Sequence, residues 1–254
     1  MQTTTAPPPI PVDRTDAAST LTLAGHLEEL RRRLGLSLAV LLVAVGVSAS
    51  QIDRLIVWLR RPAEGLLPAF AFFSPTEPLV AYVKVACLAG VLLAMPMILF
   101  QLWGFVRTGL SRRERSYGLM FLWWGSVLFT AGVAFAYYAL MPVSLRFLLG
   151  IGHGTLEPVI SIDTYLSFVT SIAFWCGVLF ELPAILYLLA NVGVVTPAWL
   201  SQSRPYAILI MVIIAAIVTP TTDPVSLLLM TAPMVLLYEL SIIVVRFAFR
   251  PRPL

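Results

Sequence analysis

Long apolar runs constrain this chain more than any other feature of its sequence. The first run, from Leu34 to Ile52, has 19 residues, and as a helix it would be about 28 Å long, which matches a bilayer core of about 30 Å. Only 12% of the residues are charged, against about 25% in soluble globular proteins, and the mean hydropathy is +0.91. The sequence therefore predicts an all-α membrane protein with one membrane domain.

The apolar runs predict six transmembrane helices joined by short connections. We expect the spans at about 34–52, 79–104, 117–141, 164–190, 206–218 and 225–245, within a domain that covers 22–249. Residues 1–21 hold four prolines and little apolar content, which predicts a disordered cytoplasmic tail, and residues 250–254 form a second cytoplasmic tail. Arg31–Arg33, the first run and Val47–Ala49 are together also typical of a cleavable signal peptide. Five further spans favour an uncleaved first helix.

The fifth apolar run decides the topology. Tyr206–Val218 has 13 residues, about 20 Å of helix, which is short for a crossing. If this run were re-entrant, five crossings would leave the C-terminus outside together with Arg246, Arg250 and Arg252. With six crossings, 12 of the 17 basic residues lie on the inner side, as the positive-inside rule requires. We therefore expect six crossings with both termini in the cytoplasm.

Capping patterns and a proline predict where several helices begin and bend. Ile52–Leu59 has apolar residues at helical spacing, which predicts a short amphipathic helix on the outer surface. Ser74–Glu77 and Ser111–Glu114 are capping-box patterns before the second and third helices. Asp163 is expected to cap the fourth helix. The third helix is expected to bend at Pro142.

Nothing in the sequence predicts enzyme chemistry. There is no glycine-rich phosphate loop with a lysine, and His26 and His153 are the only histidines, so ATP use and hydrolysis are not indicated. Cys87 and Cys176 lie in apolar runs away from any cluster with metal-ligand spacing. We therefore expect a protein that is not an enzyme and needs no cofactor or metal. The net charge of +4 comes from arginines that flank apolar runs, which favours membrane orientation over nucleic-acid binding.

An acidic residue inside an apolar run is the clearest candidate for function. Glu181 lies in the fourth run, two residues before Pro183, and a charge near the bilayer centre costs roughly 2.5–3.5 kcal/mol on insertion scales. Three interpretations remain open. Glu181 serves the carbonyl that Pro183 leaves free, it pairs within the bundle, or it has a functional role.

Two further acidic residues, Glu29 and Glu114, flank the membrane on the side predicted to be cytoplasmic. Glu29 precedes Arg33 by four residues, and Glu28 precedes Arg32 in the same way, so intrahelical salt bridges are the default interpretation. Glu114 stands at the third position of a capping box, where a glutamate needs no ligand. Their shared side is nevertheless the one on which a positively charged partner would meet them.

The segment His26–Arg33, before the first span, resembles the N-terminal signature of the TatC family, the receptor subunits of twin-arginine translocases. Other segments agree in family order, and the resemblance covers about residues 22–249. These segments are Phe73–Pro78 with Lys84, Pro96 with Gln101–Phe105, Gly109-Leu110 with Glu114, Phe129–Tyr137, Phe180–Pro183, Arg204–Tyr206, Thr219-Pro220 with Asp223, and Pro233 with Tyr238-Glu239.

The resemblance implies a concave, glove-like bundle of six helices in the bacterial plasma membrane. It implies export of folded proteins whose signal peptides carry paired arginines, driven by the proton-motive force. The partners implied are these signal peptides, the single-span subunits TatA and TatB, other copies of this chain and the lipid bilayer, but no nucleic acid.

The resemblance also assigns roles to particular residues. They are Glu29, Glu114, Arg31 and Phe105 for signal-peptide binding, Glu181 as the intramembrane polar residue, and Thr219 and Asp223 for partner contact. There are two departures from the family pattern: Thr108 stands where the family has proline, and Thr221-Thr222 make the outer hairpin one residue longer. Two rival functions, a proton-coupled small-molecule transporter using Glu181 and a structural membrane scaffold, account for fewer of these residues.

Overall fold

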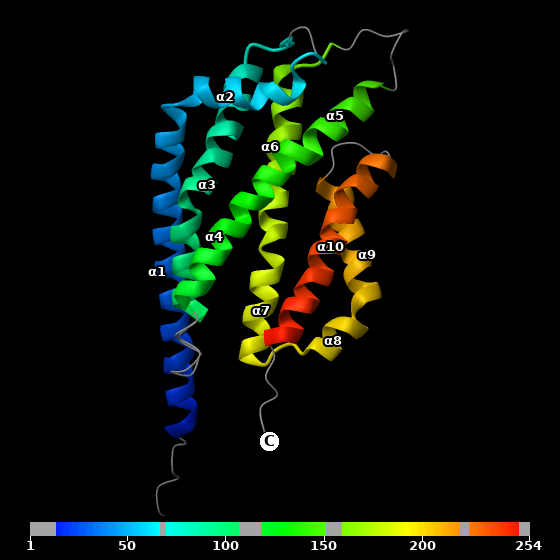
Figure 1. Cartoon of the computed structure of the whole chain (residues 1–254). Coiled ribbons are helices and arrows are strands. Elements are labelled where there is room, and N and C mark those ends of the chain that lie inside the picture. The colour runs from blue at the N-terminus through cyan, green and yellow to red at the C-terminus, as the bar shows by residue number, and fades with distance from the viewer. Residues whose placement is uncertain (1–13, 67–69, 107–117, 151–158, 219–223, 249–254) are drawn as a thin grey trace, which may run out of the picture.

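The computed structural model describes residues 14–66, 70–106, 118–150, 159–218 and 224–248, and in this part the chain is almost entirely helical (Figure 1). The elements are α1 (Arg14–Ala49), α2 (Ile52–Arg60), the 3-10 turn η1 (Arg61–Ala63), α3 (Glu77–Val106), α4 (Gly118–Phe135), the π-helical turn η4 (Ala136–Leu140), α5 (Met141–Gly150), α6 (Ile162–Phe180), α7 (Leu182–Val192), α8 (Pro197–Gln202), α9 (Arg204–Val218) and α10 (Pro224–Ala248). Extended pairing in the described residues is limited to one bridge between Ala71 and Ser161. The predicted all-α fold class is confirmed.

Five stretches of helix are long and apolar enough to cross a bilayer. They are Leu27–Ala49, Glu77–Val106, Leu122–Gly150, Ile162–Ala190 and Pro224–Phe247. These stretches correspond to the first four predicted spans and the sixth. The helix at the fifth predicted span, α9, has only 15 residues and is about 22 Å long. The inequality in length that the sequence predicted is therefore present in the structure.

The helices form a single layered bundle (Figure 1). α1 packs along α3 at one edge, α9 and α10 lie at the other edge, and α4 to α7 lie between them. α2 lies across one end of the bundle and α8 lies at the opposite end, and we call these the α2 end and the α8 end. The start of α1 and the finish of α10 both lie at the α8 end.

The amphipathic helix α2 is fastened to the bundle by two tyrosine hydroxyls. Tyr137 donates a hydrogen bond to the Trp58 carbonyl at 2.7 Å, and Tyr165 donates to the Leu59 carbonyl at 2.8 Å. The Tyr137 ring also stacks on Trp58, with 3.9 Å between the ring centroids, and Leu59 is buried. The predicted short amphipathic helix is confirmed.

The cap of α6 differs from the prediction. Ser161, not Asp163, is the N-cap residue, and its hydroxyl accepts a hydrogen bond from the Thr164 N–H at 3.1 Å. Asp163 instead accepts a hydrogen bond from Lys84 Nζ at 2.7 Å, and Lys84 also donates to Ser167 at 2.7 Å. Serine and aspartate are both good caps. The choice between them therefore depends on the ion pair with α3, for which the local sequence carries no signal.

The first helix is longer than its apolar run. α1 begins at Arg14, eight residues before the domain boundary expected at residue 22, so the tail expected to be disordered is helical from residue 14. The last proline of that tail is Pro11, and neither proline nor glycine occurs in residues 12–24, so nothing in the backbone chemistry stops the helix there. Residues 1–13 and the expected tail 250–254 lie outside the described residues.

The third long helix changes its winding near the predicted bend. The π-helical turn η4 lies between α4 and α5 and ends two residues before Pro142. Pro142 has no N–H to donate to the Tyr138 carbonyl, so the π-helical turn occupies the place where the α-helical ladder is interrupted. The capping pattern Ser111–Glu114, expected to open this helix, lies outside the described residues.

Glycines let neighbouring helices approach closely at two crossings. A Cβ atom placed on Gly90 of α3 would lie 2.9 Å from the backbone nitrogen of Val45 on α1. A Cβ atom placed on Gly132 of α4 would lie 2.5 Å from the carbonyl oxygen of Cys176 on α6. Both distances are shorter than a normal carbon contact of about 3.5–4.0 Å. These glycines therefore set the spacing between α1 and α3 and between α4 and α6.

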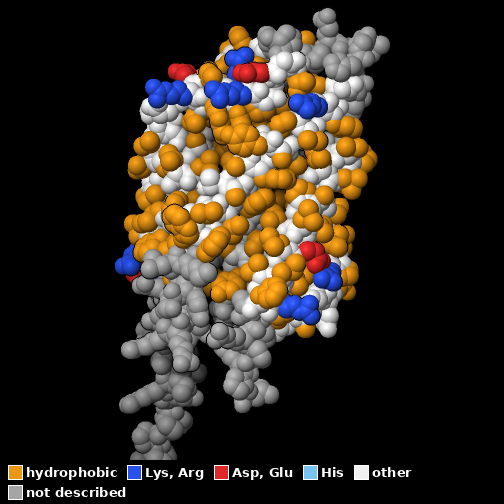
Figure 2. Space-filling model, viewed as in Figure 1, with side chains coloured by type: hydrophobic (Ala, Val, Ile, Leu, Met, Phe, Trp, Pro, Cys, Tyr) orange, Lys and Arg blue, Asp and Glu red, His pale blue; other side chains and the backbone are white. Residues whose placement is uncertain are grey.

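Apolar side chains cover the sides of the molecule. Figure 2 shows hydrophobic side chains across the middle of the visible face and charged side chains gathered near the two ends. On α1, Leu34, Leu38 and Leu42 are each more than half exposed. A surface that is apolar in a central band and charged at both ends suits a lipid bilayer and not water. The protein is therefore a multi-pass membrane protein.

Candidate functional site

The structure describes four of the seven predicted site residues. Glu29 and Arg31 lie on α1, Phe105 lies on the last turn of α3, and Glu181 lies between α6 and α7. The other three, Glu114, Thr219 and Asp223, lie outside the described residues. These residues form two separate polar positions, a cluster around Glu29 near the α8 end and Glu181 deeper in the bundle.

Glu29 is paired with an arginine of its own helix. Arg33 donates two hydrogen bonds to Glu29 Oε1, from Nε at 3.0 Å and from Nη2 at 2.7 Å. The Glu29 side chain is 25% exposed and the Arg33 side chain 13% exposed, so water screens this pair less than it screens a pair on an open surface. The predicted salt bridge between these two residues is confirmed.

Three neighbouring charges on α1 are exposed. Glu28, Arg31 and Arg32 all present their side chains to the surroundings. None of them takes part in the ion pairs formed by the described residues, so the predicted pairing of Glu28 with Arg32 is wrong. Both residues have long side chains on an exposed helix face, where holding them in one geometry costs more entropy than the Coulomb attraction repays.

Arg33 also joins α1 to the end of α3. Its Nη1 donates a hydrogen bond to Oε1 of the buried Gln101 at 3.3 Å. Its guanidinium lies directly against Gly104, where a Cβ atom would be 2.6 Å from Arg33 Cζ. Phe105 follows Gly104 and is half-buried. Arg33 therefore holds the Glu29 carboxylate beside the turn of α3 that carries Phe105.

Glu181 lies at a break in the fourth long helix. α6 ends at Phe180 and α7 begins at Leu182, with Glu181 between them. The Glu181 N–H donates to the Val178 carbonyl at 3.1 Å, which closes a tighter turn than an α-helical one. Pro183 has no N–H and cannot continue the ladder. Although glutamate is an ionisable residue, Glu181 is only 4% exposed.

The Glu181 carboxyl group has no hydrogen-bond partner for either oxygen among the described residues. It lies against α4 and α3, because a Cβ atom on Gly125 would be 3.0 Å from Glu181 Oε2 and 2.7 Å from Leu99 Cδ1. Leu99 is seven residues from the end of α3, which places this carboxyl about 10 Å inside that end. A buried polar group without a partner costs about 1–3 kcal/mol. Among the described residues, the Glu181 side chain neither serves the carbonyl that Pro183 leaves free nor pairs within the bundle, and its functional role stays a prediction.

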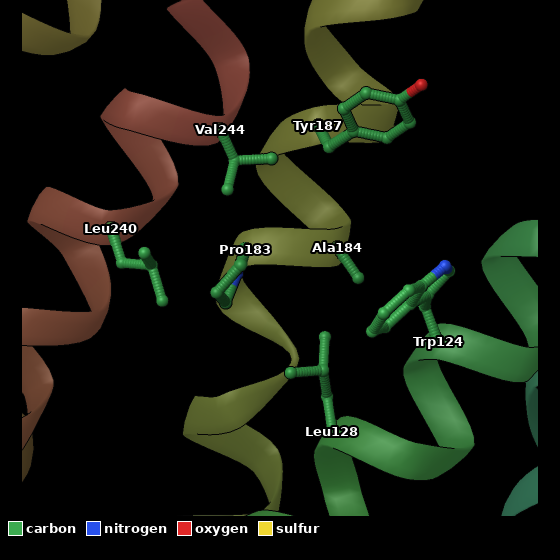
Figure 3. Close-up of a pocket in the computed structure, with 7 residues that line it drawn as sticks. All are labelled: Trp124, Leu128, Pro183, Ala184, Tyr187, Leu240 and Val244. Atoms are coloured by element: carbon green, nitrogen blue, oxygen red, sulfur yellow. The ribbon is translucent and has the colours of Figure 1, made fainter. Parts of the chain in front are cut away.

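An apolar cavity lies between α4, α7 and α10 (Figure 3). It has a volume of about 300 Å³ and is lined by Trp124, Leu128, Pro183, Ala184, Tyr187, Leu240 and Val244. The side chains come from α4, α7 and α10 and converge from three directions. Trp124 adjoins Gly125, and Pro183 follows Glu181 by two residues, so two of the lining residues lie close in sequence to the Glu181 site, although Glu181 itself does not line the cavity.

A second set of polar contacts ties the short helices at the α8 end to α10. Arg204 at the start of α9 pairs with Glu239 at 2.9 Å. Tyr238 donates a hydrogen bond to the Leu200 carbonyl of α8 at 2.9 Å. Within the described ranges, no group of three or more His, Cys, Asp and Glu side chains is placed to hold a metal ion.

Sequence reasoning did not find every part of these sites. The spacing of four residues pointed to Arg33, but nothing local indicated that Gln101 and Gly104 would receive its guanidinium. The cavity was also missed, because Trp124 and Leu240 lie on helices far apart in the chain and only packing brings them together. A signal was available for Trp124 alone, as one of two adjacent tryptophans within an apolar run.

Comparison with known proteins gives consistent matches over most of the chain. A family described as Sec-independent protein translocase protein (TatC) matches residues 25–233. A Sec-independent protein translocase protein TatC of Carboxydothermus hydrogenoformans is 35% identical over 227 residues, which are 89% of this chain and 93% of that protein. The protein of the same name in Aquifex aeolicus is 36% identical over 234 residues, 91% of this chain and 97% of that one.

A solved structure agrees with the fold as well as with the sequence. The crystal structure titled twin arginine translocase receptor TatC superposes on this chain with a TM-score of 0.81 at 36% sequence identity. The superposition covers 89% of this chain and all of that chain. Glu29, Phe105 and Glu181 all lie within the matched family region, residues 25–233.

Proposed function

The chain belongs to the TatC family of Sec-independent protein translocase proteins, and from this premise we propose that it binds twin-arginine signal peptides at its α8 end. As a family member it is a subunit of the twin-arginine translocase, which makes it a component of protein transport and not an enzyme. In this proposal, the bound signal peptide directs a folded cargo protein to export driven by the proton-motive force.

The observation that carries the proposal is the environment of Glu29. Its carboxylate accepts two hydrogen bonds from a guanidinium, at 2.7 and 3.0 Å, and still keeps 25% of its side chain exposed. The position can thus hold an arginine and can also be reached from outside. Exposed Arg31 and half-buried Phe105 lie on the two helices that meet there and complete the proposed binding surface.

We assign the second arginine of the signal peptide to Glu114. Two carboxylates on separate segments can each take one guanidinium through paired hydrogen bonds, and lysine, a point charge, cannot reproduce that geometry. An edge position also suits the cargo, because each arginine would cost roughly 2.5–3.5 kcal/mol at mid-membrane. The affinity should therefore decrease as the salt concentration rises.

The proposed orientation puts the α8 end in the cytoplasm of a bacterial cell, at its plasma membrane. α1 starts and α10 finishes at the same end of the bundle, which supports an even number of crossings and hence six. Helix α9 runs from α8, at the α8 end, towards the other end. Its length of 15 residues implies that the bilayer thins around it or that neighbouring subunits shield it.

In this proposal, the apolar part of the signal peptide binds at the apolar cavity. The cavity of about 300 Å³ beside α4, α7 and α10 is lined by apolar and aromatic side chains, as binding sites for apolar ligands usually are. Glu181, two residues before the lining residue Pro183, offers one polar group deeper than Glu29. We assign contacts with TatA and TatB to the segment between α9 and α10, which contains Thr219 and Asp223. We assign contacts with other copies of the chain to the concave, glove-like bundle.

Photo-cross-linking tests this function directly. A twin-arginine signal peptide carrying a photoreactive group is added to membranes that contain the translocase, in parallel with a matched Lys-Lys peptide. We expect cross-linking to be strong for the arginine peptide and about tenfold weaker for the lysine peptide, the effect of losing one charge-assisted hydrogen bond. Glu29→Ala and Glu114→Ala should each weaken cross-linking without lowering protein abundance.

Glu28→Ala is the matched control for Glu29→Ala. It removes the same charge one residue away, from a side chain that is exposed and takes part in none of the ion pairs formed by the described residues. If Glu29→Ala and Glu114→Ala cross-link as well as the unmutated chain, the assignment of the two carboxylates is wrong. Equal cross-linking of the arginine and lysine peptides would refute the proposed function itself.

A further inference from the structure

The carboxylate proposed to receive a cargo arginine already holds an arginine of the receptor. Arg33 donates from Nε and Nη2 to the same Glu29 oxygen, Oε1, whereas a fully paired signal-peptide guanidinium would use both oxygens of the carboxylate. With 13% of its side chain exposed, Arg33 is the better buried partner. A cargo arginine therefore cannot reach the full hydrogen-bonding capacity of Glu29 while Arg33 remains in place.

Arg33 is seated at this position by α3 as well as by Glu29. Its Nη1 donates to Gln101 at 3.3 Å, and its guanidinium rests on the bare Cα of Gly104. Gln101 and Glu29 thus engage different nitrogen atoms of one guanidinium. Breaking the contact with Glu29 leaves the contact with Gln101 free to persist, so Arg33 has a second acceptor close at hand when it moves.

We propose that Arg33 is a specificity-determining residue, which occupies Glu29 in the empty receptor and must be displaced by an arginine of the signal peptide. This inference rests on the proposed function. Binding then becomes an exchange of one guanidinium for another at the same carboxylate. An arginine of the cargo restores both hydrogen bonds that Arg33 gives up, whereas a lysine offers a single point charge and restores them incompletely.

The exchange explains how a carboxylate near the membrane edge can reject ordinary positive charge. An empty carboxylate would attract any cation, including lysine and simple salts, through Coulomb attraction alone. When a guanidinium already occupies the carboxylate, only a ligand with matching hydrogen-bond geometry displaces it. Specificity is then a difference between two affinities, and Arg33 is the element that works against the wrong ligand.

The test compares Arg33→Gln with Arg32→Gln. Both substitutions remove one positive charge from adjacent positions of α1, but the structure shows an ion pair for Arg33 and an exposed side chain for Arg32. Membranes containing each complete translocase are cross-linked to a labelled twin-arginine peptide, and unlabelled Arg-Arg or Lys-Lys peptide competes. The concentration for half-competition gives the relative affinity of each peptide.

We expect Arg33→Gln to bind the Lys-Lys peptide about tenfold more tightly than Arg32→Gln does, because binding no longer breaks the hydrogen-bonded ion pair of Glu29 with Arg33. The Arg-Arg peptide should bind at least as well as it does to Arg32→Gln. Gly104→Ala tests the same displacement without changing the charge, since the added methyl group meets the flexible end of Arg33. Gly104→Ala should likewise increase the affinity for the Lys-Lys peptide.

Two outcomes would overturn the inference. In the first, Arg33→Gln and Gly104→Ala discriminate between the two peptides as strongly as Arg32→Gln does. In the second, Arg33→Gln weakens the Arg-Arg peptide and leaves the Lys-Lys peptide unchanged, which would mean that Arg33 orients Glu29 and does not compete for it. Both outcomes are distinct from failure of the proposed function, in which the unmutated chain itself shows no preference for arginine.

Discussion

Replacing Gly132 by valine should separate two central helices and lower the stability of the bundle. A Cβ atom at this position would lie 2.5 Å from the carbonyl oxygen of Cys176 and 2.9 Å from its carbonyl carbon. Normal contacts begin at about 3.5 Å, so α4 and α6 would have to move apart by about 1 Å. Both obstructing atoms belong to the backbone and cannot rotate away as a side chain would.

The expected loss is about 2 kcal/mol, the middle of the range for overpacking of a well-packed core. For a chain of this size, that loss corresponds to a decrease of about 4–8 °C in the midpoint of thermal unfolding. The assay is thermal unfolding of the purified protein in one detergent, followed by the amount that remains monodisperse after heating.

Gly46→Val is the matched control for this prediction. Gly46 also lies in a membrane-spanning helix, but nothing lies within 4 Å of a Cβ atom placed on it. The two substitutions therefore change helix propensity and hydrophobicity equally, and they differ only in packing. Equal unfolding midpoints for Gly132→Val and Gly46→Val would refute the argument that Gly132 sets the spacing between α4 and α6.

Two further predictions concern a hydroxyl and a carboxyl. Tyr165→Phe removes a buried side-chain donor to the Leu59 carbonyl and should cost about 1–2 kcal/mol. The unfolding midpoint should be lower than that of Tyr138→Phe, a residue that is 71% exposed; equal midpoints would contradict this. Glu181→Leu removes two buried oxygens that have no hydrogen-bond partner in the described part of the chain, so it should raise the unfolding midpoint. It should also abolish transport while signal-peptide cross-linking is largely retained. Transport at the normal rate would return Glu181 to a structural role.

Much of the fold follows from the sequence because hydropathy acts over whole helices. The five long spans and the short α9 match the predicted runs, since 20 or more apolar residues leave a segment little choice in lipid. The positions of caps are less predictable. Ser161 and Asp163 both suit an N-cap, and only the distant Lys84 decides between them.

The candidate site divides in the same way. The pair of Glu29 and Arg33 is a contact within one helix, so a spacing of four residues was sufficient to predict it. The contacts of Arg33 with Gln101 and Gly104 depend on how α1 packs on α3. Gln101 is 68 residues further along the chain than Arg33. A single sequence carries no periodic signal for a contact of that kind.

α1 and α3 approach each other closely at two points, so a tilt of α1 around one point moves the residue at the other. Gly90, which meets the Val45 backbone, and Gly104, which meets the Arg33 guanidinium, are 14 residues apart on α3, about 21 Å. On α1, the contacted residues Val45 and Arg33 are 12 residues apart, about 18 Å. If α1 tilts by about 10° around the Gly90 crossing, Arg33 moves by about 3 Å, more than a hydrogen bond tolerates. A small change of angle in the membrane is thereby converted into the making or breaking of the Arg33 contact with Gln101. Any subunit or lipid that presses on the exposed side of α1 therefore changes how Arg33, the partner of Glu29, is held against α3.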